Sequence, residues 1–233
     1  MHIVTTLPDT LLQIADTKLV LANVCIAAVF NGRSIGDFAT VLAIAGTSLG
    51  ATRALYRLLE DHGWEYQALE RGRDREGIAS SDLLDGPPQS WADLVTTIFL
   101  AEAGLDAIAT GLAGREDRRV AGQLRMLAKD GAFHESYCLG WLRVLTRHER
   151  GDVEHAIESR LARARRWVNG IDGGRPNVAF ETACQRLADA VGHPLSADSA
   201  PATSDWNARL RRSSALPPGL WELCRFKDAE ALA

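Results

Sequence analysis

Hydrophobic residues recur every three or four positions along most of this chain, a period typical of α-helices that bury one face. The longest such segment covers residues 117–147, and its apolar stripe contains Leu124, Leu127, Gly131, His134, Cys138, Trp141 and Leu145. The segment before it, 91–112, has a stripe of Trp91, Val95, Ile98, Glu102, Leu105, Ala109 and Leu112. The pattern therefore predicts two long helices that each turn one polar side chain, Glu102 or His134, toward the core.

The same pattern predicts five further helices. Their expected ranges are 11–30, 35–61, 152–168, 178–191 and a short helix after Pro217. Asp9 or Thr10 is the expected N-cap of the first helix, and Ser90 is the expected N-cap of the helix at 91–112. Residues 71–90 are polar and rich in turn formers, so we expect one long surface connection there.

The first two predicted helices contain few polar residues. Between Leu19 and Phe30 only Asn23 is polar, but this apolar stretch is shorter than the roughly 20 residues that cross a bilayer, which favours a buried helix over a membrane anchor. In the second helix the expected apolar side consists of Phe38, Leu42, Ala45, Leu49, Tyr56 and Leu59. Small residues at 45–51 would let a neighbouring helix come close.

Composition supports a helical protein with a proper core. The chain has 233 residues, of which 46% are hydrophobic and 6% aromatic, and it is rich in alanine, leucine and arginine. A net charge of −4 argues against a nucleic-acid partner selected by bulk charge. Four widely spaced cysteines, Cys25, Cys138, Cys184 and Cys224, are typical of buried reduced thiols, and the N-terminal residues lack a signal-peptide pattern. We therefore expect a cytoplasmic protein without a membrane segment.

Glu102 and His134 on facing helices suggest part of a carboxylate-bridged di-metal site. Such a site takes a Glu from each of two helices and a Glu-x-x-His pair from each of two others. The residue three before His134 is Gly131, which has no side chain. The sequence therefore supplies only part of that ligand set.

Several local strings resemble the PaaA/PaaC family of bacterial phenylacetate catabolism, whose members are ferritin-like proteins of phenylacetyl-CoA epoxidase. The strings lie at residues 19–21, 49–53, 99–102, 129–134 and 140–142, within a resemblance that covers roughly residues 10–170. The resemblance implies an all-α fold, a ferritin-like four-helix bundle with additional C-terminal helices. We expect one domain over residues 1–233, with core helices at about 10–147 and extra helices and a docking arm at about 150–233.

Position by position, the resemblance places the first-helix glutamate of the catalytic branch near Ala27 or Ala28. It places the second-helix Glu-Leu-Gly-His pattern on Ser48-Leu-Gly-Ala51. Only Glu102 and His134 of six ligands are kept, too few donors for two irons. We therefore expect no catalytic residue, no cofactor and no metal in this chain.

The resemblance then implies a structural, non-catalytic subunit of a phenylacetyl-CoA-epoxidase-like monooxygenase complex. Its partner would be a homologous catalytic subunit that holds the di-iron centre and the acyl-CoA, and self-association stays open. Two alternatives remain at this point. One is a stand-alone metal-dependent oxygenase with a reduced ligand set, and the other is a homo-oligomeric ferritin-like scaffold.

The side chains near Glu102 and His134 allow two interpretations. In one, Glu102 and His134 are ligand positions left from an ancestral site and hydrogen-bond to each other or to nearby acids. In the other, Asp106 and Asp130, each one turn away, complete a mononuclear or rearranged metal site with them, which Glu135 could join. The first interpretation is favoured because the complementary ligands are missing.

Arginines on the fifth major helix are a second candidate site. Arg160, Arg163, Arg165 and Arg166 could bind phosphates of a coenzyme A thioester or a nucleotide. The favoured interpretation is a solvated helix face whose charges are answered by Glu154 and Glu158.

Overall fold

A computed structural model describes residues 6–114, 118–171, 177–196 and 215–225. Across these ranges the chain forms α-helices, short 3-10 turns and no strand, which confirms the predicted all-α fold. The helices are α1 (Leu7–Ala28), α2 (Ile35–Leu59), α3 (Tyr66–Arg71), α4 (Trp91–Ala113), α5 (Arg118–His148), α6 (Arg150–Ile171), α7 (Val178–Val191) and α8 (Pro218–Cys224).

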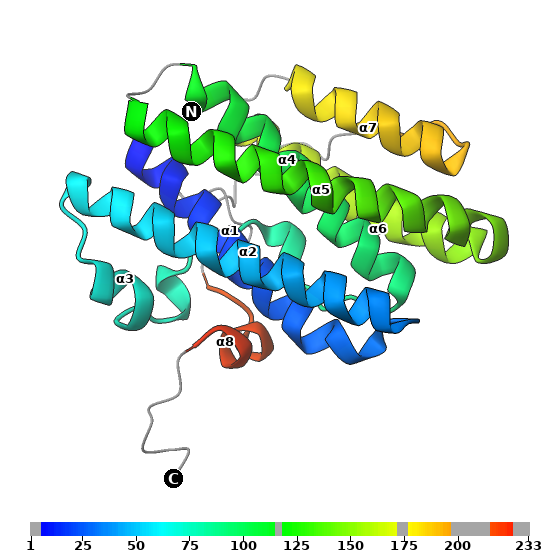
Figure 1. The fold of residues 1–233 in the computed structure, drawn as a ribbon, viewed down its shortest axis with the longest axis horizontal. Coiled ribbons are helices and arrows are strands. Elements are labelled where there is room, and N and C mark those ends of the chain that lie inside the picture. Colours follow the sequence, from blue (N-terminus) through cyan, green and yellow to red (C-terminus); the bar gives the residue numbers. More distant parts are fainter. Residues whose placement is uncertain (1–5, 115–117, 172–176, 197–214, 226–233) are drawn as a thin grey trace, which may run out of the picture.

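The helices pair as two hairpins that pack into a ferritin-like bundle. α1 packs against α2 and α4 against α5, while α6 and α7 cover other sides of α4 and α8 lies against α1 (Figure 1). Every residue from Trp91 to Leu105 is buried, so α4 is the central helix. The connection between α4 and α5, at residues 114–117, lies largely outside the described residues.

The first helix begins earlier than predicted. Thr6, not Asp9 or Thr10, is the N-cap, and its side chain accepts a hydrogen bond from the Asp9 amide in a capping box. Pro8 lies in the first helical turn, where its missing N–H would have no intrahelical partner anyway. The proline is therefore the second residue of the helix.

Residues 78–84 correct the prediction of a surface connection, because all seven are buried. Side chains of α1 satisfy backbone donors of this segment: Asp16 Oδ2 accepts from the Ala79 amide at 2.7 Å, and Thr17 Oγ1 accepts from the Ser81 amide at 3.0 Å. A non-helical segment can be buried only where its polar backbone groups find such partners. The pattern of turn residues identified the break in the helix but not its burial.

The second helix follows the prediction at Ala45, Tyr56 and Leu59, which are buried, but its N-terminal half faces another way. Phe38 and Leu42 were expected on its buried side, yet their exposed fractions are 38% and 48%. Asp37 is buried instead and accepts hydrogen bonds from Tyr137 Oη at 2.6 Å and Trp141 Nε1 at 2.8 Å. This polar contact with α5 fixes which face of α2 points inward.

By length and composition, α1, α2 and α4 are each apolar enough to cross a membrane, so the length argument made from the first predicted helix was wrong. Burial within the bundle distinguishes the three. The most apolar window is 72% buried in the α1 span and 83% buried in α4, but only 33% buried in the α2 span. The bundle itself therefore covers two of these helices and leaves most of the third uncovered.

The described part of the C-terminal segment packs on its own chain. Leu216, Leu220 and Cys224 are buried, and the Leu216 amide donates to the Arg75 carbonyl at 3.0 Å. α8 therefore docks on α1 of the same molecule. The remainder of the predicted docking arm, at 197–214 and 226–233, lies outside the described residues.

Gly104 tests the close packing of α4 against α6. A Cβ atom at this position would lie 2.6 Å from Cζ3 of Trp167 and 3.0 Å from Cγ2 of Val168. We expect Gly104→Ala to lower the free energy of unfolding by about 1–3 kcal/mol through overpacking, measured by urea denaturation. Gly111→Ala in the same helix is the control, because no atom lies within 4 Å of its added Cβ. An equal loss in both variants would contradict the close contact.

Candidate functional site

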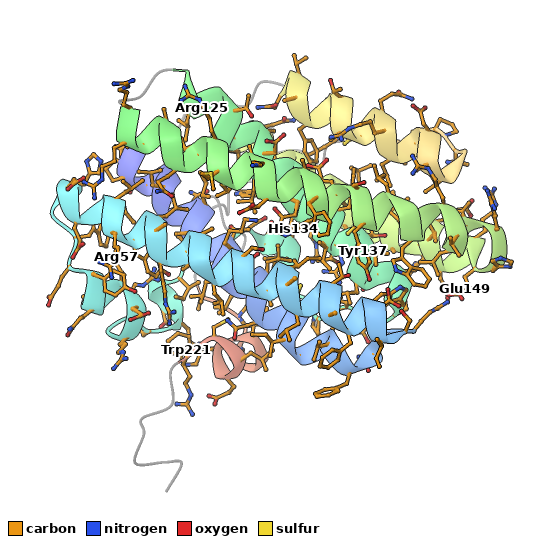
Figure 2. The ribbon with its side chains drawn as sticks, in the orientation of Figure 1. Arg57, Arg125, His134, Tyr137, Glu149 and Trp221 are labelled. Atoms are coloured by element: carbon orange, nitrogen blue, oxygen red, sulfur yellow. The ribbon has the colours of Figure 1, made fainter. Side chains whose placement is uncertain are left out.

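A chain of polar groups, buried except for Thr47 at its α2 end, crosses the middle of the bundle and joins its four main helices. Lys18 of α1 donates to Oε1 and Oε2 of Glu102 on α4, at 2.8 Å and 2.6 Å. Glu102 Oε1 is also 2.8 Å from Nδ1 of His134 on α5, and His134 Nε2 is 3.1 Å from Oγ1 of Thr47 on α2. Figure 2 shows His134 near the middle of α5, beside α2. Each main helix thus contributes one polar side chain.

The charged members of this chain are almost completely shielded from water. The exposed fractions are 1% for Lys18, 0% for Glu102 and 2% for His134. Burial alone would raise the pKa of the Glu102 carboxyl, but the charge of Lys18 and the hydrogen bond from His134 lower the pKa to about 2. Glu102 is therefore a carboxylate at neutral pH, and the lysine ammonium compensates its charge.

The structure brings Glu102 and His134 together, which confirms that they hydrogen-bond to each other. The α1 residue that meets Glu102 is Lys18; Ala27, near which the family glutamate was expected, is exposed and lies about two and a half helical turns beyond Lys18. Sequence reasoning missed Lys18 altogether. The available signal was a lysine in a stretch that is otherwise largely apolar, where a buried charge requires a partner.

The positions expected for the other ligands carry no carboxylate or imidazole side chain. Ser48 is buried, and its hydroxyl has no hydrogen-bond partner among the described residues. A Cβ atom added at Gly131 would lie 3.3 Å from Oε2 of Glu102. Gly131 therefore leaves space for the Glu102 carboxylate where a longer side chain would compete with it.

Asp106 and Asp130 do not complete a single-metal site with Glu102 and His134. Within the described ranges, no three His, Cys, Asp or Glu side chains form a group able to hold a metal ion. The Thr110 hydroxyl donates to Asp106 at 3.4 Å, and Asp130 is only half-buried.

A di-iron centre does not fit this donor set. Both oxygens of Glu102 accept from Lys18, and each ring nitrogen of His134 has a polar neighbour. The Lys18 ammonium already occupies the space in front of the Glu102 carboxylate. Two metal ions at this place would find almost no other ligands. That the chain binds no metal nevertheless stays a prediction.

A second buried acid lies beside the central chain. Burial raises the pKa of Glu135 to about 7, against the opposing effect of Arg186, whose Nη2 donates to Oε2 of Glu135 at 2.7 Å. The pKa of Asp106 is also raised, mainly by burial. The contact between α5 and α7 therefore contains a carboxyl group that titrates near neutral pH.

The arginines of α6 correct the prediction of a solvated face, because three of the four are buried in ion pairs between elements. Arg160 binds both oxygens of Asp93 at 2.8 Å, and Arg166 Nη2 lies 3.1 Å from Oδ2 of Asp82. Arg165 binds both oxygens of Glu181 on α7 at 2.9 Å. These guanidinium groups hold α6 to its neighbours and are not available to bind phosphate.

The central ion pair can be tested with Lys18→Met, Glu102→Gln and the double variant. We expect Lys18→Met to lower the free energy of unfolding by about 3–5 kcal/mol, because it leaves a buried carboxylate without its cation. The double variant should lose less than the sum of the two single variants. Since the folded-state pKa of Glu102 is about 2 and its usual value is 4.5, the pair's contribution is present above pH 4.5 and is lost as the pH falls toward 2.

Urea denaturation between pH 3 and pH 8 measures both effects. Arg53→Met is the matched control, because Arg53 forms an exposed pair with Glu70 at 3.2 Å and such pairs contribute at most about 1 kcal/mol. Strict additivity of the two central substitutions would contradict a direct Lys18–Glu102 interaction.

Glu135 should give the opposite pH dependence. Its folded-state pKa of about 7 lies above the usual 4.5, so its contribution is fully present below pH 4.5 and is lost as the pH rises through 7. Glu135→Gln should therefore be more stable than the wild type by about 1–3 kcal/mol at pH 8 and nearly equal at pH 5. Glu154→Gln, in an exposed pair with Arg150, should show no such difference. A gain of the same size at both pH values would contradict titration of Glu135.

Comparison with known proteins identifies the family of this chain. The sequence model of the phenylacetic acid catabolic proteins, PaaA_PaaC, matches residues 3–169, a range that contains α1 to α5 and most of α6. A search among curated proteins found no match. Because the family match covers well over half of the sequence, including all four residues of the central polar chain, this protein belongs to the phenylacetic acid catabolic protein family.

Proposed function

We propose that this chain is a structural, non-catalytic subunit of a multicomponent, phenylacetyl-CoA-epoxidase-like monooxygenase. The observation that supports this role is the ammonium of Lys18, 2.6 Å and 2.8 Å from the two oxygens of Glu102. Family membership connects the chain with phenylacetate catabolism. The lysine distinguishes it from a subunit that binds metal at this place.

The Lys18 ammonium supplies the positive charge of a metal ion but not its redox or coordination chemistry. It neutralises the buried carboxylate, so that the bundle can be stable without an ion. It has no redox state and no open coordination position at which oxygen or a substrate could bind. A helical bundle closed in this way is suited to supporting another subunit.

The partner in this proposal is a homologous catalytic subunit in the cytoplasm. That subunit would hold the di-iron centre and the acyl-CoA, and a reductase would supply its electrons. This chain would contribute rigidity and contact surface. The absence of a usable donor set between its own helices is the reason to assign the oxidation chemistry to the partner.

Co-expression with the genomic neighbours that belong to the same family tests this role. We expect an affinity-tagged chain produced in iron-supplemented medium to co-purify with one such neighbour in equal amounts. We expect iron in the complex and much less than one iron per chain in the protein purified alone. Mass spectrometry identifies the partner and elemental analysis measures the iron.

A matched variant separates the two possible locations of the iron. Lys18→Met removes the ammonium without adding a ligand, so the iron content per assembled complex should not change even though the lower stability of the variant reduces the yield. Two irons per chain in the protein purified alone, or oxidation of an acyl-CoA by this chain with only an electron donor, would contradict a structural role and favour the stand-alone oxygenase.

A further inference from the structure

An exposed apolar patch lies where α1 ends and α2 begins. The exposed fractions of its members are 42% for Ile26, 86% for Phe30, 90% for Ile35, 38% for Phe38 and 48% for Leu42. The rings of Phe30 and Phe38 contact each other at 5.7 Å between centroids. In Figure 1, α2 runs across the front of the molecule and no described helix crosses it.

The patch continues along α2 as a row of small residues. Ala39, Ala43, Gly46 and Gly50 are exposed and follow one another at helical spacing. A Cβ atom added at Gly46 or Gly50 would meet nothing within 4 Å. Between residues 35 and 52 the only charged side chain is Asp37, which is buried. We call the patch and this row together the α2 face.

The two halves of the α2 face are complementary in shape. Its N-terminal half carries the bulky side chains Ile35, Phe38 and Leu42, and its C-terminal half carries the glycines Gly46 and Gly50. When two such helices pack antiparallel, the bulky half of each lies on the small half of the other. A two-fold axis near the middle of the helix produces this arrangement with identical surfaces.

We propose that the α2 face binds the α2 face of a second copy of this chain, with the two α2 helices antiparallel about a two-fold axis. The five bulky side chains leave on the order of 500 Å² of apolar surface uncovered, near the upper end of what a typical monomer exposes. Two copies together bury on the order of 1,000 Å² from these side chains alone, which reaches the lower bound of about 1,000 Å² for a specific interface.

The small residues favour a protein partner over a lipid surface. Glycine and alanine contribute little apolar area to a bilayer, but they let another helix backbone approach closely. The exposed side chains Arg53 and Arg57 follow the row of small residues within α2. The uncharged surface therefore ends before the helix does, and a second α2 is long enough to cover it.

Sedimentation equilibrium of the full chain tests this dimer. We expect the wild type at 50 µM to have twice the 25.3 kDa mass of one chain. Gly46→Glu should raise the dissociation constant at least about 100-fold, since it puts a charge at the centre of an apolar contact. A side chain at position 46 meets no atom within 4 Å of its Cβ in the monomer. The helical signal in circular dichroism and the thermal unfolding midpoint of the monomer should therefore not fall.

Gly111→Glu is the matched control, because Gly111 is an exposed glycine in α4, away from the α2 face, and its added Cβ also meets nothing within 4 Å. This variant should dimerise like the wild type. A monomeric wild type at 50 µM, or a Gly46→Glu dimer as tight as the wild type, would overturn the proposal. A monomer that instead forms an equimolar complex with a family homologue, lost in Gly46→Glu, would also overturn it and assign the face to that homologue.

Discussion

The contact between Lys18 and Glu102 is the interaction on which the centre of this bundle depends. An isolated carboxylate at 0% exposure would be far more stable in the protonated form, and an isolated ammonium would be similarly unfavourable. The Lys18 ammonium and the Glu102 carboxylate together form a compact ion pair inside apolar surroundings, and His134 hydrogen-bonds to the same carboxylate. These three side chains also join α1, α4 and α5, so the two helical hairpins are connected by charge as well as by packing.

Further ion pairs between elements surround the bundle. Asp16 of α1 binds Arg73 at 2.7 Å and accepts from Tyr56 at 2.7 Å, while Asp93 of α4 binds Arg160. The Asp16–Arg73 pair attaches the long segment between α3 and α4 to α1. Arg160 of α6 also donates to the Leu83 and Gly86 carbonyls of that segment. Buried charges therefore specify how the elements are arranged, a role that nonspecific apolar packing fills less well.

Local pattern was sufficient to predict the helices but not their rotation. The range expected for α7, 178–191, is confirmed, and α4 was located to within one residue, because helical periodicity and caps are local signals. The direction of the N-terminal half of α2 depends on Asp37 meeting two side chains about one hundred residues later in the chain, and no local pattern contains that information. Phe38 and Leu42 were therefore assigned to the wrong side.

The candidate site was predicted in part for a similar reason. Glu102 and His134 interrupt apolar stripes in amphipathic helices, so their inward direction was visible in the sequence. Lys18 lies in a helix that is buried on nearly every side, where periodicity gives no direction. Its partner is 84 residues away, and the resemblance directed attention to a glutamate that this chain lacks.

The burial of residues 78–84 has an evolutionary consequence. Connections between helices usually tolerate insertions because they lie on the surface, but this one uses the carboxylate of Asp16 and the hydroxyl of Thr17 to satisfy its amides. Adding or removing a residue here would shift those amides away from their acceptors. Length variation among relatives should therefore concentrate in the more exposed stretch around residues 60–65, where the chain can change without disturbing the interior.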